Sequence, residues 1–306
     1  MTTSEPAGGC RPGARCVGFL GAAGPAARFS GSASICKAIM RRSFSMSERL
    51  HATLEGPDGA PVVALGTSIG TSQGLWDPQA ALLARRFQLL RFEMRGHGAP
   101  GAQSPAPPGP YSIAELGTDV LTLLNERDID RVAYCGISLG GMVGMWLAAN
   151  APERITQLGL CCTAAYLPPA SMWAQRAATA RSEGMAALVD QVIARWFTPA
   201  YARRCPDAVA AVAAMLAGTD PEGYAGCAEA IGEMDQRAAI AAITAPTLVI
   251  AAAEDPSTPP WHGAQIARAI PGARLVVVRG AAHLASYQAP GQITAALQAH
   301  LAPLLR

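Results

Sequence analysis

The stretch VAYCGISLGGMVGMWLAA, residues 132–149, joins an apolar, strand-like run to a helix-like run through a serine set between glycines. The pentapeptide GISLG fits the pattern G-x-S-x-G, which is a weak signal by itself because small residues often meet in turns. The flanking strand and helix supply the context of a nucleophile elbow, a strained turn that exposes a serine hydroxyl. Gly136 and Gly140 would give the chain room to fold back on itself. We therefore predict that Ser138 is a nucleophile.

Short apolar runs alternate with amphipathic segments on both sides of this turn. The strand-like runs are APVVAL (60–65), FQLLRFE (87–93), RVAYCG (131–136), QLGLCC (157–162), PTLVIAA (246–252) and RLVVVRG (274–280). The helix-like segments are residues 76–86, 111–128, 136–150, 261–270 and 292–304. Such alternation predicts an α/β fold, in which helices flank a mostly parallel central sheet.

Residues 166–241 interrupt this alternation, because they are rich in alanine, amphipathic and almost free of strand-like runs. Breaks at RRCPD and GTDPEGYAG divide the segment into about three or four helices. We predict a helical insertion at 166–241 between the two parts of one α/β core, residues 46–165 and 242–306.

The positive charge of the chain is concentrated at its N-terminus. The formal net charge is +2, but residues 1–45 hold six basic residues and one acid, a net +5, so the rest of the chain carries −3. A nucleic-acid partner needs clustered positive charge on a folded face, and none is predicted here. Residues 1–45 are rich in Gly, Ala, Ser and Arg, which favours a disordered extension over the alternative, a targeting segment.

The eight cysteines contain no CxxC pair and show no metal-ligand spacing with histidine. This pattern predicts free thiols in a reducing cytosol, and therefore a cytoplasmic protein without a metal site. The longest apolar runs have the length of strands and are broken by Gly, Pro or charge, so we predict no membrane span.

A serine hydroxyl is a poor nucleophile at neutral pH and needs a base that is held by an acid. In chains with this elbow the three residues follow in the order serine, acid, histidine. Asp255 comes just after the strand-like TLVIAA, and His283 just after LVVVRG, so both would lie at the C-terminal edge of the sheet. We predict that Ser138, Asp255 and His283 form a catalytic triad that uses no cofactor.

Other residues compete for the roles of acid and base. Glu254 is the alternative acid, one position before Asp255. Among the histidines, His97 precedes the serine in a glycine turn, and His262 begins the helix after the acid, too early to follow a strand of its own. His51, in the first strand, and His300, in the last helix, fit a surface or packing role better.

The oxyanion of such a reaction needs two N–H donors. Leu139 starts the helix after the serine, so its N–H and the positive end of the helix dipole would face the site. The second donor should come from the loop LGTSIGTSQGLWDPQ after the first buried strand, where we choose Ile69. The alternative is an ordinary loop whose glycines, Gly66 and Gly70, only make a turn.

From about Ser47 to the end, the chain resembles the 3-oxoadipate enol-lactonase group of the α/β-hydrolases. The matching stretches are GTSIGTSQGLWDPQ, RGHGAPGAQSPAPPGPYSIAELGTDVL, CGISLGGMVG, MWAQRAATARSEGM, RWFTP, EGYAGCAEAI, APTLVIAAAEDPSTPP and GAAHLASYQAP. The resemblance implies an α/β-hydrolase fold with the insertion as a cap over the active site, and a triad of Ser138, Asp255 and His283. The chain departs from the family at Thr67, where the family often has asparagine, and at Glu93, where it usually has aspartate.

The resemblance also implies the reaction, which is hydrolysis of 3-oxoadipate enol-lactone to 3-oxoadipate in aromatic degradation by the β-ketoadipate pathway. The substrate carries a carboxylate, and some members have a basic residue where this chain has Tyr166. Candidates for binding the substrate are Trp173 and Tyr166 and the cap arginines Arg176, Arg181 and Arg195; each arginine could equally lie on a solvated helix face. The alternatives are a broad carboxylesterase, a cofactor-free perhydrolase, or a small-molecule receptor that keeps the triad without turnover.

Overall fold

Seven strands form one sheet in the part of the chain that the computed structural model describes, residues 50–98 and 106–306. They are β1 (Ala52–Glu55), β2 (Val62–Gly66), β3 (Gln88–Phe92), β4 (Val132–Ile137), β5 (Ile155–Cys161), β6 (Thr247–Ala252) and β7 (Arg274–Val278). Their order is β1-β3-β2-β4-β5-β6-β7, and only the β1–β3 pair is antiparallel. The mostly parallel sheet is confirmed. The extension predicted for residues 1–45 lies outside the described residues.

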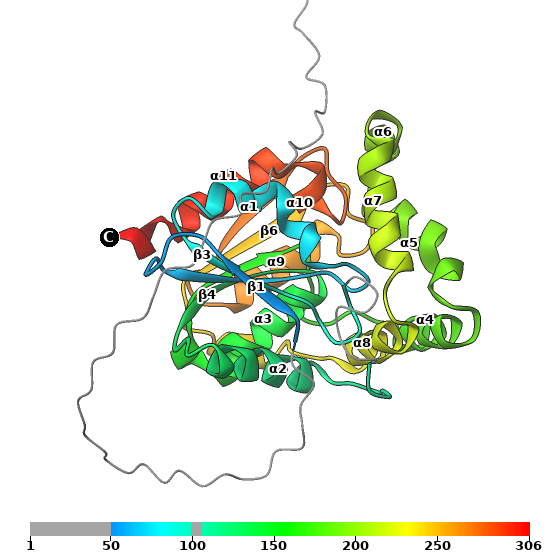
Figure 1. Ribbon diagram of the computed structural model, residues 1–306, viewed down its shortest axis with the longest axis horizontal. Coiled ribbons are helices and arrows are strands. Elements are labelled where there is room, and N and C mark those ends of the chain that lie inside the picture. The colour runs from blue at the N-terminus through cyan, green and yellow to red at the C-terminus, as the bar shows by residue number, and fades with distance from the viewer. Residues whose placement is uncertain (1–49, 99–105) are drawn as a thin grey trace, which may run out of the picture. The chain divides into compact units, whose positions relative to one another are not determined.

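Helices cover both faces of this sheet (Figure 1). On one face lie α2 (Ile113–Glu126), α3 (Leu139–Asn150) and α9 (Pro260–Ala269), and on the other α1 (Asp77–Leu83), α10 (Ala285–Gln288) and α11 (Pro290–Leu301). Parallel strands need such crossover connections. Helix α2 begins at a capping box, in which the side chain of Ser112 accepts the N–H of Glu115 and the Glu115 carboxylate accepts the N–H of Ser112.

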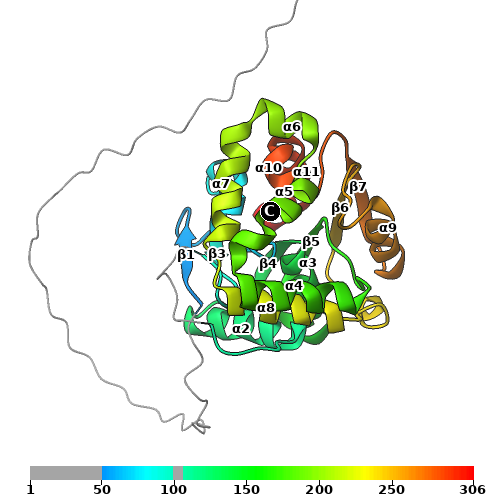
Figure 2. The same ribbon diagram turned by 90° about the vertical axis from the view of Figure 1, so that its right-hand side faces the viewer.

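The segment of the chain that connects β5 to β6 forms five α-helices, which lie together (Figures 1 and 2). The sequence predicts about three or four helices in this segment. They are α4 (Ala170–Glu183), α5 (Val189–Trp196), α6 (Pro199–Arg204), α7 (Pro206–Ala217) and α8 (Pro221–Glu233). The predicted number is wrong because two further breaks were missed, one at Gly184, which ends α4 with φ 78°, and one at Thr198. Its side chain accepts the N–H of Tyr201, and Pro199 takes the first helical position, so a new helix starts there.

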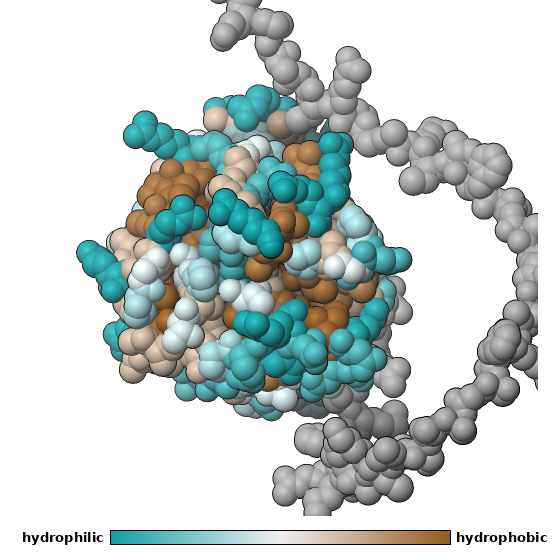
Figure 3. Space-filling model, turned by 90° about the vertical axis from the view of Figure 1, so that its left-hand side faces the viewer, coloured by the Kyte–Doolittle hydropathy of each residue, from teal (hydrophilic) through white to brown (hydrophobic). Residues whose placement is uncertain are grey.

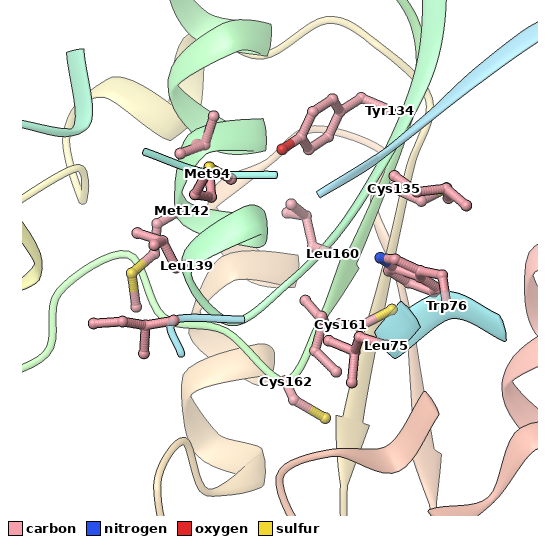
Figure 4. Packing of buried hydrophobic residues seen from close by; sticks show 14 of the residues in the cluster. Leu75, Trp76, Met94, Tyr134, Cys135, Leu139, Met142, Leu160, Cys161 and Cys162 are labelled. Atoms are coloured by element: carbon pink, nitrogen blue, oxygen red, sulfur yellow. The ribbon is translucent and has the colours of Figure 1, made fainter. Parts of the chain in front are cut away.

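The core strands β4 and β6 are buried at every residue, as continuous apolar strands of a parallel sheet covered on both faces should be. Neighbouring side chains on β4 point to opposite faces of the sheet. The Tyr134 ring lies beside α3 (Figure 4), whereas the Sγ atom of Cys135 lies near Gly159 on the face that α11 covers. The core therefore fixes the orientation of β4 on both sides just before Ser138.

Strand β7 departs from the burial that its sequence RLVVV indicates, since Leu275, Val276 and Val277 are exposed. It is an edge strand with one neighbour, β6, so fewer elements cover it. Apolar patches lie between polar areas on the face seen in Figure 3. No helix among the described residues combines the length and the apolar character that crossing a membrane requires.

Candidate active site

Ser138 occupies the turn between β4 and α3 with φ 54° and ψ −116°, a conformation rarely adopted by a residue with a side chain. Hydrogen bonds to the end of β5 and to the residues just after it hold its backbone there. Its N–H donates to the carbonyl of Cys161 at 3.0 Å, and its carbonyl accepts the hydroxyl of Thr163 at 2.7 Å. Because strained backbone persists only where its surroundings over-determine it, this turn is a built feature of the fold.

The glycines beside Ser138 are needed because backbones approach closely. A Cβ atom on Gly136 would lie 2.2 Å from the carbonyl oxygen of Gly140, and one on Gly140 would lie 2.4 Å from the carbonyl carbon of Gly66. The N–H of Gly140 also donates to the carbonyl of Thr67 at 2.8 Å, which joins α3 to the loop after β2. The prediction that these glycines make room for the turn is confirmed.

The structure brings Ser138, His283 and Asp255 into hydrogen-bond contact from three separate strand ends. His283 Nε2 lies 2.9 Å from Ser138 Oγ, and His283 Nδ1 lies 2.8 Å from Asp255 Oδ2. All three side chains are buried. An ionised carboxylate can only accept, so Nδ1 carries the proton and Nε2 accepts the hydroxyl of Ser138. The arrangement can draw a proton from the serine.

The Asp255 carboxylate is held by its own loop. Oδ1 accepts the N–H groups of Ser257 at 2.7 Å and Thr258 at 2.9 Å, and Oδ2 accepts the Thr258 hydroxyl at 2.8 Å. Burial acts to raise the pKa of the Asp255 carboxyl, but His283 and the Thr258 hydrogen bonds outweigh it and hold the pKa below its ordinary value. Thr258 was missed from the sequence, although DPST has the spacing at which an aspartate accepts its own downstream N–H groups.

Of the competing residues, only His262 lines the same cavity as Ser138 within the described part of the chain, and its ring stacks on Trp261 at 3.5 Å; the others lie outside the cavity lining. Glu254 is exposed, and His97 is buried with Nδ1 2.7 Å from the Arg95 carbonyl oxygen; burial lowers the pKa of His97 to about 4. His51 precedes β1 instead of lying in it, which corrects its predicted place. His300 Nε2 lies 3.1 Å from the Leu158 carbonyl oxygen, a packing role. Among the described residues, no group of His, Cys, Asp and Glu side chains could hold a metal ion.

A cavity of about 240 Å³ opens onto the Ser138–His283 pair, just below the usual range of about 300–1,000 Å³ for ligand pockets. Ile69 lines it from the loop after β2. Neither the N–H of Ile69 nor that of Leu139 donates a backbone hydrogen bond within residues 50–98 and 106–306. Both residues are buried. Their role as oxyanion donors stays a prediction.

The structure separates the predicted substrate-binding residues into two groups. Trp173, Arg176 and Arg195 line the cavity. Arg181 and Tyr166 do not, because other residues engage them. The Arg181 guanidinium pairs with Glu222 and Glu229 of α8, and the Tyr166 ring lies 4.2 Å from the Arg237 guanidinium carbon. The structure therefore does not place Arg181 and Tyr166 at the cavity, where the sequence predicted them.

Two positive charges therefore face the cavity from the helices between β5 and β6. Arg176 lies 5.0 Å over the Trp173 ring, and its Nε is buried without a hydrogen-bond partner. Arg195 donates from Nη2 to the Pro256 carbonyl at 2.6 Å and from Nε to the Ser257 hydroxyl at 3.3 Å. Burial, and then the neighbouring Arg176, lower the pKa of Arg195. An anionic group bound between the two guanidinium groups would relieve this repulsion.

Comparison with known proteins identifies the family. A model described as the α/β-hydrolase fold matches residues 60–290. The chain is 36% identical over 244 residues to 3-oxoadipate enol-lactonase 2 of Acinetobacter baylyi, covering 80% of this chain and 90% of that protein. It is 30% identical over 238 residues to RutD of Pseudomonas savastanoi, a protein named as a putative carbamate hydrolase. That match covers 76% of this chain and 90% of RutD. The solved enol-lactonase of Burkholderia xenovorans matches with a TM-score of 0.80 at 39% identity, covering 83% of this chain and 96% of that one.

The chain belongs to the α/β-hydrolase fold family. Within it, the chain is similar to the 3-oxoadipate enol-lactonases over most of its length, so the resemblance drawn from the sequence is confirmed. The predicted fold class is confirmed as well, and so is the predicted enzyme class, an ester or lactone hydrolase.

Proposed function

We propose that this enzyme hydrolyses 3-oxoadipate enol-lactone to 3-oxoadipate. The observation that carries the proposal is the hydrogen-bonded set of Ser138, His283 and Asp255, which faces a small cavity lined by two arginines. The similarity of the chain to enol-lactonases over most of its length supports it. The substrate is a small lactone with one carboxylate. Such a molecule needs both a nucleophile for its ring carbonyl and a cation for its acid group.

Catalysis would begin at Ser138. Its Oγ attacks the lactone carbonyl carbon while His283 Nε2, 2.9 Å away, takes the hydroxyl proton. Asp255 orients the imidazole and stabilises the imidazolium through Nδ1. The carbonyl oxygen becomes an oxyanion, which the N–H groups of Ile69 and Leu139 would stabilise.

Collapse of this intermediate breaks the ring C–O bond, and the electron pair leaves on the enol oxygen. The enolate takes up the proton that His283 took from Ser138, becomes the ketone, and leaves His283 neutral. An enolate is a better leaving group than a simple alkoxide, so this step needs less help from an acid. Water then attacks the acyl-enzyme, His283 takes a proton from that water and returns it to Ser138, and the second carboxylate of the product is released.

The helices α4–α8 would act as the cap that selects the substrate. Arg176 on α4 and Arg195 on α5 would bind the carboxylate, and Trp173 would hold the ring side of the molecule. A charge-assisted hydrogen bond contributes about 1.5–3 kcal/mol, which corresponds to roughly one to two decades in kcat/KM. A neutral ester of similar size gains no such contact.

A cytoplasmic location is also proposed, from the cysteine pattern. Cys135, Cys161 and Cys227 are buried thiols, and burial raises the pKa of each above its ordinary value. Buried thiols of this kind are unreactive and need no disulfide, as is usual in a reducing compartment.

The decisive experiment compares kcat/KM for 3-oxoadipate enol-lactone with that for neutral aryl and alkyl esters and for a small carbamate. We expect the lactone to exceed a neutral ester of similar size by at least about tenfold. Esters turned over as fast as the lactone would replace the proposal with a broad carboxylesterase. The similarity to RutD makes carbamate hydrolysis the second candidate, and preferred turnover of the carbamate would establish it.

A further inference from the structure

His283 lies on a loop, residues 279–284, that leads from β7 to α10. Catalytic side chains on loops depend on contacts that hold the loop in place, because a misplacement of about 1 Å can lower a rate by about 10²-fold. Gln288, the last residue of α10, lies beneath this loop with only 8% of its surface exposed. Gln288 takes no direct part in the proposed reaction.

The carboxamide of Gln288 uses its full hydrogen-bonding capacity inside the protein. Its Oε1 accepts the N–H groups of Ala282 at 3.1 Å and Thr198 at 3.3 Å. Its Nε2 donates to the carbonyl of Gly280 at 3.0 Å and to the hydroxyl of Thr198 at 2.6 Å. One side chain therefore ties the loop just before His283 to the start of α6, among the inserted helices.

The other side of His283 is tied to the same segment. The N–H of Leu284 donates to the carbonyl of Trp196 at 3.1 Å, two residues before Thr198. The loop is thus fastened on both sides of His283 to residues 196–198, once directly and once through Gln288. Its position depends on the inserted helices as well as on the sheet.

We propose that Gln288 is a positioning residue for His283, which fixes the histidine loop against the inserted helices so that Nε2 stays within reach of Ser138. The inference rests on the catalytic role of His283 in the proposed function. Only an amide side chain can make all four hydrogen bonds, since it offers two acceptor sites and two donors. An ionised glutamate cannot donate to Gly280, and a methionine of similar size can neither donate to it nor accept strongly from the two N–H groups.

The test measures how fast Ser138 reacts with a fluorophosphonate probe, in which the serine oxygen forms a bond to phosphorus, fluoride leaves, and His283 takes the proton. Mass spectrometry follows the labelled protein, and thermal unfolding followed by circular dichroism gives Tm. Gln288→Met is the main variant. Gln292→Met is the matched control, because Gln292 makes a single 3.4 Å contact to the same loop, at Arg279, and is exposed.

We expect Gln288→Met to label about 10- to 100-fold more slowly than the wild type at temperatures well below its Tm, and Gln292→Met to label at the wild-type rate. Gln288→Glu should come closer to the wild-type rate at pH 6 than at pH 9, because a protonated carboxyl regains one donor; a purely structural role would not produce this pH dependence. If Gln288→Met does not fold, Thr198→Val, which removes one of the four contacts, carries the same test.

Equal labelling of Gln288→Met and the wild type would overturn the inference, as would an equal loss in Gln292→Met. These outcomes leave the proposed function intact as long as the wild type is labelled and Ser138→Ala is not. Failure of the probe to label the wild type at Ser138 would instead refute the catalytic triad itself, and with it both proposals.

Discussion

The Nε2 atom of His283 lies 2.9 Å from the Oγ atom of Ser138, although 145 residues separate them in the chain. The serine stands at the end of β4 and the histidine follows β7, three strands away in the sheet. Parallel strands bring their C-terminal ends to one edge, so residues that follow different strands can meet there. This contact underlies the first prediction.

Replacing Ser138 or His283 singly by alanine should lower kcat by about 10³-fold or more, and Asp255→Asn by about 10⁴-fold, because members of a triad act as a unit. Steady-state kinetics on the enol-lactone, with Tm as the measure of folding, provides the check. His97→Ala is the control, since His97 is buried outside the cavity and should affect Tm more than kcat. Loss of activity in a folded His97→Ala protein, with His283→Ala still active, would show that the base was wrongly chosen.

Arg176→Gln and Arg195→Gln should each lower kcat/KM for the enol-lactone by about 10- to 100-fold and change that for a neutral ester far less. The expectation follows from their place on the cavity wall. Arg181→Gln is the matched control from the same helix as Arg176, because its guanidinium is already paired with Glu222 and Glu229. If the Arg181 variant loses as much activity on the lactone as the Arg176 variant, the assignment of the carboxylate site is wrong.

Glu93 should make the protein less stable as the pH rises from about 4.5 to about 7. Burial raises the pKa of this carboxyl to about 7, although the Gln73 N–H and Arg91 oppose the shift. Between the ordinary pKa and the raised one, the folded chain keeps a proton that the unfolded chain has lost, so the free energy of unfolding falls, by up to roughly 3 kcal/mol. Glu93→Gln removes this dependence and can still accept the Gln73 N–H.

Urea unfolding of the wild type and Glu93→Gln at pH 5 and pH 8 measures the effect. The variant should gain stability relative to the wild type at the higher pH. A difference between the two proteins that stays constant over this range would mean that Glu93 does not titrate there.

Gly140→Ala should destabilise the protein by at least about 3 kcal/mol or prevent folding, because its Cβ would lie 2.4 Å from the backbone of Gly66. Gly291→Ala is the control. A Cβ at this position in α11 meets no atom within 4 Å, so the substitution should be neutral or slightly stabilising. Denaturant unfolding compares the two variants. Similar stabilities for both would contradict the close approach of α3 to the loop after β2.

Local signals in the sequence predicted the elbow and the order of the elements. The run VAYCG, the serine between glycines and the helix-like segment after it are all contained in residues 132–149. The same alternation of apolar runs predicted that Asp255 and His283 each come just after the end of a strand. Local signals failed where a break was subtle, as at Thr198, where a side-chain cap and a proline begin a helix that periodicity alone did not separate.

The sequence by itself determined the class of fold and three residues able to form a triad, because strand-and-helix periodicity and the special backbone needs of a serine turn are written in neighbouring residues. Only the tertiary structure decided which arginines face the cavity and which residues hold the histidine loop. Arg176 and Arg181 lie on the same helix. Arg181 pairs with two carboxylates of α8, whereas Arg176 lines the cavity. Gln288 meets Thr198 across 90 residues. Contacts between distant segments depend on how helices pack, which no local pattern encodes.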